Sequence, residues 1–139
     1  MVRAKAKYLL DTNVISEPAR PVPNPRFLER FEEHEGQMAI ASVTWHEALY
    51  GAELLAEGKR KRAVLEYLRA LALPVLPFDE EAAEWFAKER ARLKRKGKPA
   101  PYADGQIAAI AAVNGLALVT ANERDFRAFE GLVIAGWLG

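Results

Sequence analysis

The chain contains no cysteine and only two histidines, and this scarcity excludes several kinds of site before any motif is considered. Without cysteine the protein has neither disulfides nor thiolate metal sites. The two histidines, His34 and His46, lack the spacing of a zinc site. The absence of cysteine also suits a reducing compartment, and we expect the protein to be cytoplasmic.

Long apolar runs are absent as well. No stretch reaches the ~18 apolar residues of a transmembrane helix. The start, MVRAKAKYLLDTN, is basic but lacks the apolar run of about 7–15 residues that a signal peptide needs. The charges almost cancel, since 20 Lys and Arg stand against 19 Asp and Glu. The 139 residues are typical of one domain, and we expect a single domain over residues 1–139.

Short apolar runs alternate with helical segments along the whole chain. The pattern predicts strands at 7–10, 38–41, 73–77, 116–120 and 132–134. It predicts helices at 25–35, 42–57, 59–71, 80–96, 103–114 and 122–129. Asp11, Ser42 and Asp79 are the expected N-caps. This alternation predicts an α/β fold with a mostly parallel sheet of about four to five strands flanked by helices.

Four acidic residues fall where the strand ends of such a sheet would meet. Asp11 ends the first strand and Asp125 follows the strand at 116–120, whereas Glu47 and Asp104 lie early in two helices. Ligands of open α/β sheets bind outside the carboxyl ends of the strands. We therefore expect all four carboxylates to converge at one edge of the sheet.

Helical phase places two of these acids, Glu47 and Asp104, on apolar stripes. The apolar partners are Val43, Tyr50 and Leu54 for Glu47, and Ile107, Ala108 and Ala111 for Asp104. A carboxylate on an inward apolar face is costly unless something compensates its charge. By contrast, Glu84 and Glu89 are predicted to be solvated surface acids.

Converging carboxylates favour a bound cation. Two unit charges about 4 Å apart repel by about 4 kcal/mol at an effective dielectric constant near 20. Such a cluster either takes up protons or binds a cation, and oxygen ligands favour Mg²⁺ or Mn²⁺. Carboxylate-held magnesium is well suited to phosphodiester hydrolysis, because it polarises the phosphate and activates water.

Four parts of the sequence together resemble the PIN-domain family, close to the VapC-type toxins of bacterial toxin–antitoxin pairs. They are LLDTNVIS at 9–16, Glu47 early in its helix, ADGQIA at 103–108 and LVTANERDF at 118–126. The resemblance covers nearly the whole chain in order. It implies an endonuclease that cuts single-stranded RNA with Mg²⁺ or Mn²⁺ and uses a four-carboxylate site.

The resemblance also implies roles and partners. Asp11, Glu47, Asp104 and Asp125 fall on the family's acidic positions, and Asp11 and Asp104 would be the most direct metal ligands. Thr12, Thr120 and Asn122 would be the supporting polar residues. The family further implies a homodimer and a small antitoxin, encoded beside the toxin, that plugs the site.

Two basic runs, 59–62 and 90–98, have two interpretations. Each is typical of a solvated helix face, and each can also bind phosphate. The second run leads into the loop before Asp104, so it could guide RNA toward the site.

Other functions have to be weighed. A haloacid-type phosphatase needs a second aspartate where Asn13 stands, and a receiver domain needs an acidic pair near its start and a late lysine, neither of which is evident. The remaining alternative is a catalytically inactive PIN-like module that binds RNA or protein. The intact set of four acids argues against it.

Overall fold

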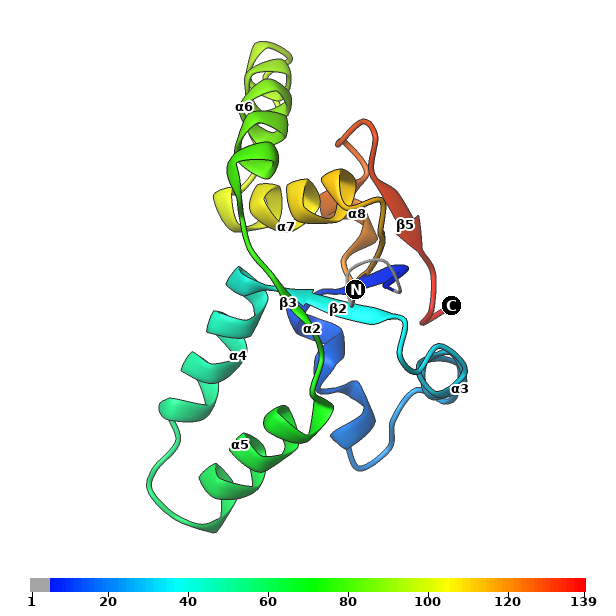
Figure 1. Cartoon of the computed structure of the whole chain (residues 1–139), viewed down its shortest axis with the longest axis vertical. Coiled ribbons are helices and arrows are strands. Elements are labelled where there is room, and N and C mark those ends of the chain that lie inside the picture. Colours follow the sequence, from blue (N-terminus) through cyan, green and yellow to red (C-terminus); the bar gives the residue numbers. More distant parts are fainter. Residues whose placement is uncertain (1–5) are drawn as a thin grey trace.

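A five-stranded parallel sheet forms the centre of the molecule in the computed structural model, which describes residues 6–139 (Figure 1). Residues 1–5, which hold part of the basic start, lie outside the described residues. The strands are β1 (Tyr8–Leu10), β2 (Met38–Ala41), β3 (Val75–Leu76), β4 (Ala117–Val119) and β5 (Val133–Ala135). Their order is β3-β2-β1-β4-β5, and every neighbouring pair is parallel. The predicted α/β class and parallel sheet are confirmed.

Alternating side chains on the strands bury two separate cores. Leu9 and Leu118 pair in register and pack into one core, whereas Leu10 and Val119, the next pair, pack into the other. All four side chains are fully buried. Because successive side chains of a strand point to opposite faces, both faces of the sheet need a covering layer.

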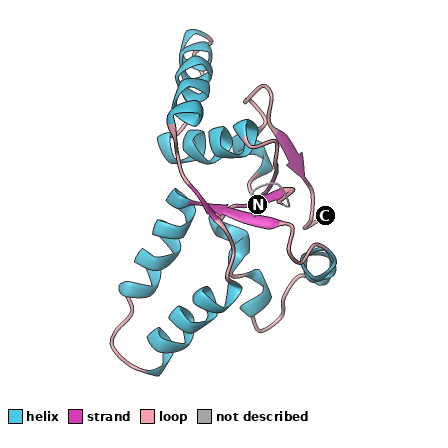
Figure 2. Cartoon of the chain, in the orientation of Figure 1, coloured by secondary structure: helices cyan, strands magenta, loops and turns pink. Residues whose placement is uncertain are grey.

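Helices cover both faces of the sheet (Figure 2). One core involves α6 (Glu80–Arg95), α7 (Tyr102–Val113) and α8 (Glu123–Phe126). The other involves α2 (Thr12–Ile15), α3 (Pro25–Glu33), α4 (Ser42–Glu53) and α5 (Lys59–Leu71), and a short 3₁₀ turn, η1 (Glu17–Ala19), follows α2. The α4–α5 hairpin and α6 extend to opposite sides of the sheet (Figure 1). Within residues 6–139 no helix has the length and apolar character needed to cross a membrane.

The helix boundaries follow local signals, with one correction. The side chains of Asp11 and Asp79 accept hydrogen bonds from the first turns of α2 and α6, as predicted for N-caps. Ser42 is not an N-cap, because Ala41 holds that position and Ser42 is already helical. Helix α4 also ends at Glu53 rather than near residue 57. The residues after Glu53 instead form the turn that brings α5 back against α4. Gly58, with φ of 153°, is the N-cap residue of α5.

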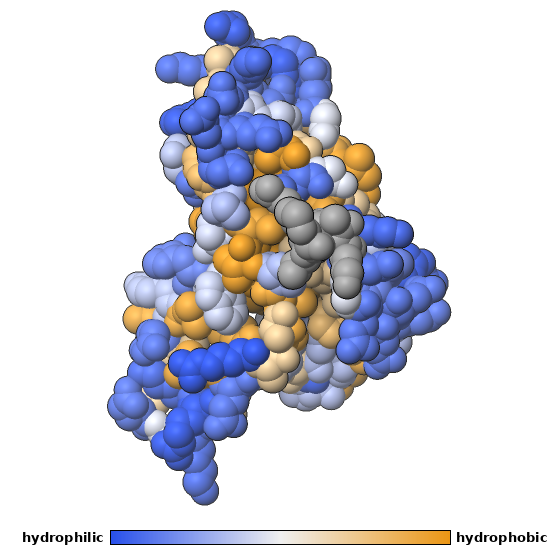
Figure 3. All heavy atoms as spheres, in the orientation of Figure 1, coloured by the Kyte–Doolittle hydropathy of each residue, from blue (hydrophilic) through white to orange (hydrophobic). Residues whose placement is uncertain are grey.

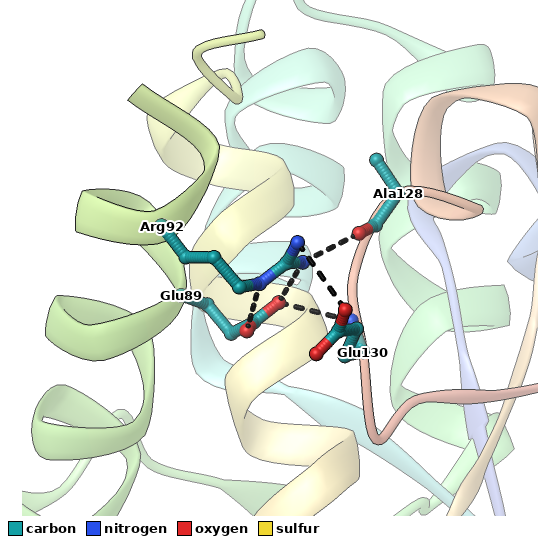
Figure 4. A network of polar contacts seen from close by, with 4 residues as sticks. All are labelled: Glu89, Arg92, Ala128 and Glu130. Carbon is teal, nitrogen blue, oxygen red and sulfur yellow. Dashed lines mark hydrogen bonds and ion pairs between the residues drawn. The ribbon is translucent and has the colours of Figure 1, made fainter. Parts of the chain in front are cut away.

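Glu89 is a second correction, because it is buried and not a solvated surface acid. Its carboxylate accepts two hydrogen bonds from Arg92, at 2.8 and 2.7 Å, and one from the backbone N–H of Glu130 at 2.9 Å (Figure 4). Arg92 also donates to the carbonyl of Ala128. The hydrogen bonds from Arg92 are the main reason why the pKa of Glu89 lies below its usual value. The pair ties α6 to the segment between α8 and β5.

Candidate functional site

Asp11 lies at the carboxyl end of the central strand, next to the point where the strand order reverses. The chain passes from β1 outward to β2 and β3, and then returns to place β4 on the other side of β1. Such a reversal leaves a crevice at the carboxyl ends of the two strands, which is the usual ligand site of open α/β sheets. The register pairs Leu10 with Val119, so the residues that follow them, Asp11 and Thr120, are neighbours.

Both carboxylate oxygens of Asp11 are held by hydrogen bonds. Oδ1 accepts the backbone N–H of Thr12 at 2.7 Å, and Oδ2 accepts the hydroxyl of Thr120 at 2.8 Å. Asp11 and Thr120 are 6 % and 2 % exposed, so the pair is almost fully buried. Its orientation is therefore fixed by the fold, as a preorganised site requires.

Two further hydrogen bonds fix the loop that follows β4. The backbone N–H of Asn122 donates to the hydroxyl oxygen of Thr120 at 3.0 Å, and the side-chain oxygen of Asn13 accepts the N–H of Ala121 at 3.1 Å. The loop after β4 is thereby joined to α2, the short helix that follows β1. Asn122 is the N-cap residue of α8, which carries Asp125, but its side chain makes no capping bond to that helix. Asp125 itself is exposed.

Asp104 enters the site from the first turn of α7. It is partly buried, and the next residue, Gly105, is fully covered by the ring of Phe86 from α6. Ile107, Ala108 and Ala111 are buried, which confirms the inward stripe predicted for this helix. Close packing of α6 on α7 therefore sets the position of Asp104.

Glu47 does not have the surroundings that its helical stripe predicted. Tyr50 and Leu54, its stripe partners, are 54 % and 68 % exposed, and Glu47 is exposed as well. The third stripe partner, Val43, is half-buried against the core, so the stripe faces outward only from Glu47 onward. Glu47 instead lines an apolar groove of about 500 Å³ between α2, α4 and α5, together with Thr12 and Arg60.

The three aspartates act on one another electrostatically. Burial is the main cause that raises the pKa of Asp11, and the charge of Asp125 raises it further against the hydrogen bonds of Thr120 and Thr12. Burial also raises the pKa of Asp104, followed by the charges of Asp11 and Asp125. Within residues 6–139, however, no three acidic or histidine side chains already form a group able to hold a metal ion. Asp11, Asp104 and Asp125 are therefore neighbouring charges without a closed ligand set, and the convergence of all four acids on one metal site stays a prediction.

These raised pKa values predict how the site affects folding. A folded-state pKa above the ordinary 3.8 means that the folded chain binds the proton more tightly than the unfolded chain. The free energy of unfolding therefore declines as the pH rises from about 3.8 through the raised values. At neutral pH in a chelating buffer, Asp104→Asn should raise the melting temperature, because it removes a partly buried charge that is also repelled by Asp11 and Asp125. Thermal unfolding at pH 4 and pH 7 measures this; equal stability of both proteins at pH 7 would contradict it.

Most of the chain matches a known family. The PIN domain family matches residues 8–132, which include strands β1 to β4 and all four candidate acids. The chain belongs to the PIN-domain family.

Relatives of this PIN domain extend over almost its full length. It is 38% identical over 135 residues to the toxin FitB of Neisseria gonorrhoeae, which covers 93% of this chain and 97% of that protein. It is 37% identical over 131 residues to the tRNA(fMet)-specific endonuclease VapC of Shigella flexneri, and this match covers 94% of this chain and 98% of that protein. The DNA-bound VapBC structure from Salmonella typhimurium matches with a TM-score of 0.81 at 36% identity and covers 95% and 98%. This PIN domain is therefore of the VapC type, a group of endoribonucleases.

The sequence placed Asn13 in a capped helical turn after Asp11, but it did not predict that the Asn13 side chain binds the loop after β4 of this PIN domain. Asn and Asp side chains often accept backbone N–H groups in turns, so the residue type was a usable signal. The hydrogen bond from Ala121, 108 residues away, could not be predicted, because it depends on β1 and β4 being neighbours. The covering of Gly105 by Phe86 also escaped prediction.

Proposed function

We propose that this PIN domain hydrolyses phosphodiester bonds of single-stranded RNA with Mg²⁺, or Mn²⁺, at the acidic site. Asp11 and Asp104 would be the direct ligands, and Asp125 and Glu47 would complete the catalytic acids. The observation that carries the proposal is a group of three neighbouring aspartates at the strand ends: burial first, and then the charges of neighbouring aspartates, raise the pKa values of Asp11 and Asp104. A cation at this place would offset the repulsion among these charges.

The donor set fits a hard cation. Each carboxylate oxygen of Asp11 accepts one hydrogen bond, which leaves a further lone pair on each for a metal ion. The chain has no cysteine, and the candidate ligands are carboxylates, as Mg²⁺ and Mn²⁺ prefer. When bound, the ion would polarise the phosphate and stabilise the charge of the transition state.

The surrounding residues of the chain would orient these groups. Thr120 and the N–H of Thr12 fix the carboxylate of Asp11, and Thr120 in turn receives the N–H of Asn122. Replacing a residue that orients a metal ligand typically lowers metal affinity or activity by about 10–100-fold. We propose Thr12, Thr120 and Asn122 as this supporting set. Glu47 and Asp125 are exposed, so both carboxylates are accessible to water.

We further propose that this single domain is the toxin of a toxin–antitoxin pair and acts in the cytoplasm. The relatives named toxin FitB and VapC support this role, and matching solved structures include a member of the VapBC toxin–antitoxin family from Mycobacterium tuberculosis. The cognate antitoxin would bind the chain and block its site. A homodimer is part of the same proposal.

The deciding experiment uses a mixed pool of structured and single-stranded RNA. The purified full chain, free of any co-purifying protein, is incubated with Mg²⁺, with Mn²⁺ or with excess chelator. We expect RNA fragments only in the two metal lanes. Cleavage that persists in chelator would contradict the metal requirement. Intact RNA in every lane, from a chain shown to be folded, would favour the inactive binding module.

A further inference from the structure

An exposed aromatic ring and two cations lie together where α6 packs on the start of α7. Tyr102, the first residue of α7, is 54 % exposed, and the guanidinium carbon of Arg90 lies 5.3 Å from its ring centroid. Lys94 follows Arg90 by one helical turn and is also exposed. We call Arg90, Lys94 and Tyr102 the α6–α7 platform.

The platform has a rigid base. Phe86, which is 3 % exposed, contacts Tyr102 edge to face with ring centroids 5.6 Å apart, and Arg90 lies 5.8 Å from the Phe86 ring as well. The Tyr102 ring is thus held by the edge-to-face contact with the buried Phe86 ring and by Arg90, whose guanidinium lies over one face, so the other face is the one that can stack. An exposed ring that is already ordered loses little conformational entropy when a planar group stacks on it.

A groove of about 570 Å³ continues from the platform along α6. Small residues and the two cations line it: Ala87, Arg90, Ala91, Lys94, Pro99 and Ala100. None of these lining residues is acidic, and the projecting α6 arm is largely hydrophilic in Figure 3. The groove therefore complements a polyanion, and its small residues leave room for a chain to lie against the helix.

The platform is close to the candidate active site. Tyr102 and Asp104 are two residues apart in the first turn of α7, where helix geometry puts their Cα atoms within about 5–6 Å. Side chains at this spacing diverge around the helix. A single strand of RNA that passes over the N-terminal end of α7 can therefore contact both residues.

We infer that the α6–α7 platform binds the single-stranded RNA beside the position where it is cut. One base stacks on Tyr102, and the neighbouring phosphates contact Arg90 and Lys94 along the groove. Stacking on an aromatic ring tolerates any base, and cationic grooves follow the backbone of a single strand. The inference rests on the proposed ribonuclease function and assigns a substrate-binding surface to it.

The test measures binding and cleavage separately. Fluorescence anisotropy with a labelled short single-stranded RNA, in excess chelator, gives affinity for the full chain across a series of salt concentrations. The double variant Arg90→Gln, Lys94→Gln removes the platform charges. The matched control, Lys88→Gln with Arg95→Gln, removes two exposed charges of the same helix that do not line the groove. Tyr102→Leu removes the ring but keeps an apolar contact with Phe86, and Tyr102→Phe keeps the ring.

We expect the platform double variant to lower the slope of log affinity against log salt by about 1.4, which is about 0.7 for each lost phosphate contact on a single strand. The control double variant should keep the slope. Tyr102→Leu should weaken binding about tenfold, as expected for one lost stacked base, and Tyr102→Phe should restore it. In the presence of metal, RNA cleavage should fall in the platform double variant and in Tyr102→Leu. It should be retained in the control double variant and in Tyr102→Phe.

Three results would overturn the inference. If the wild-type chain cuts RNA but all four variants bind it equally well, the platform is not the binding surface, and the proposed function stands. If the variants lose an acidic protein partner and keep RNA affinity, the surface serves that partner. If the folded wild-type chain neither binds nor cuts RNA, the proposed function and the inference both fail.

Discussion

Asp104→Asn is expected to lower RNA cleavage by about 10²–10³-fold while the protein stays folded. The substitution keeps the size of the side chain but removes a charge that a cation would need. Loss of several kcal/mol of transition-state stabilisation corresponds to a rate loss of this order. Asp104 is only partly buried and its helix is held by Phe86 and the apolar face below, so the uncharged amide is compatible with the fold. Initial cleavage rates in Mg²⁺, with circular dichroism as the folding control, measure the effect.

The other site residues should form a graded series. Asp11→Asn should match the loss in Asp104→Asn, whereas Thr120→Val should cost about 10–100-fold, because Thr120 acts through Asp11. Glu84→Gln on the exposed side of α6 is the matched acid control and should leave the rate unchanged. If Asp104→Asn cuts RNA as fast as Glu84→Gln does, the acidic site is not the active site, whatever nuclease activity the chain has.

The parts of the site that lie directly at strand ends could be predicted from the sequence. Asp11 follows a short apolar run and Thr120 ends another, and parallel strands bring such positions to one edge of the sheet. The reasoning needs only the alternation of strands and helices. It does not need the identity of the neighbouring strand, which is why Asp11 and Thr120 could be placed at one edge of the sheet but the bond between Asn13 and Ala121 could not be predicted.

Helical phase succeeded on α7 and failed on α4 for a physical reason. Phase shows which residues share a face, but it does not show which face is covered. On α7 the stripe below Asp104 packs on the sheet, whereas on α4 the stripe with Tyr50 and Leu54 faces outward. Glu89 shows the converse error, because a charged residue in a polar helix is buried against the α8–β5 segment and neutralised by Arg92. Both outcomes depend on tertiary packing, which a single sequence does not display.

Gly105→Ala is expected to destabilise the protein by about 1–3 kcal/mol, the usual cost of overpacking a core. Inside a helix this change alone would stabilise by about 1 kcal/mol, because alanine has the higher helix propensity. At Gly105 a new methyl group would overlap the Cε1 and Cζ atoms of Phe86 and lie 2.8 Å from its Cδ1 atom. The ring is buried and in contact with Phe78 and Tyr102, so it has little room to move away. Thermal and urea unfolding measure the change.

Gly51→Ala is the matched control, since Gly51 also lies inside a helix but has no atom within 4 Å of an added methyl group. That variant should gain about 0.5–1 kcal/mol, the opposite sign for the same chemical change. The Gly105→Ala loss should shrink when Phe86→Leu is added, because the smaller side chain makes room for the methyl group. A stabilised Gly105→Ala variant would show that α6 and α7 are not in close contact at this point.

The same substitution should also lower cleavage, for a reason that links packing to chemistry. The contact between Phe86 and Gly105 fixes how closely the first turn of α7 approaches α6, and Asp104 belongs to that turn. A methyl group between them must move the turn, the ring or both. Misplacement of a catalytic group by about 1 Å can cost on the order of 10²-fold in rate. Cleavage by Gly105→Ala should therefore fall even at temperatures where the variant is fully folded, and adding Phe86→Leu should recover part of the rate together with the stability.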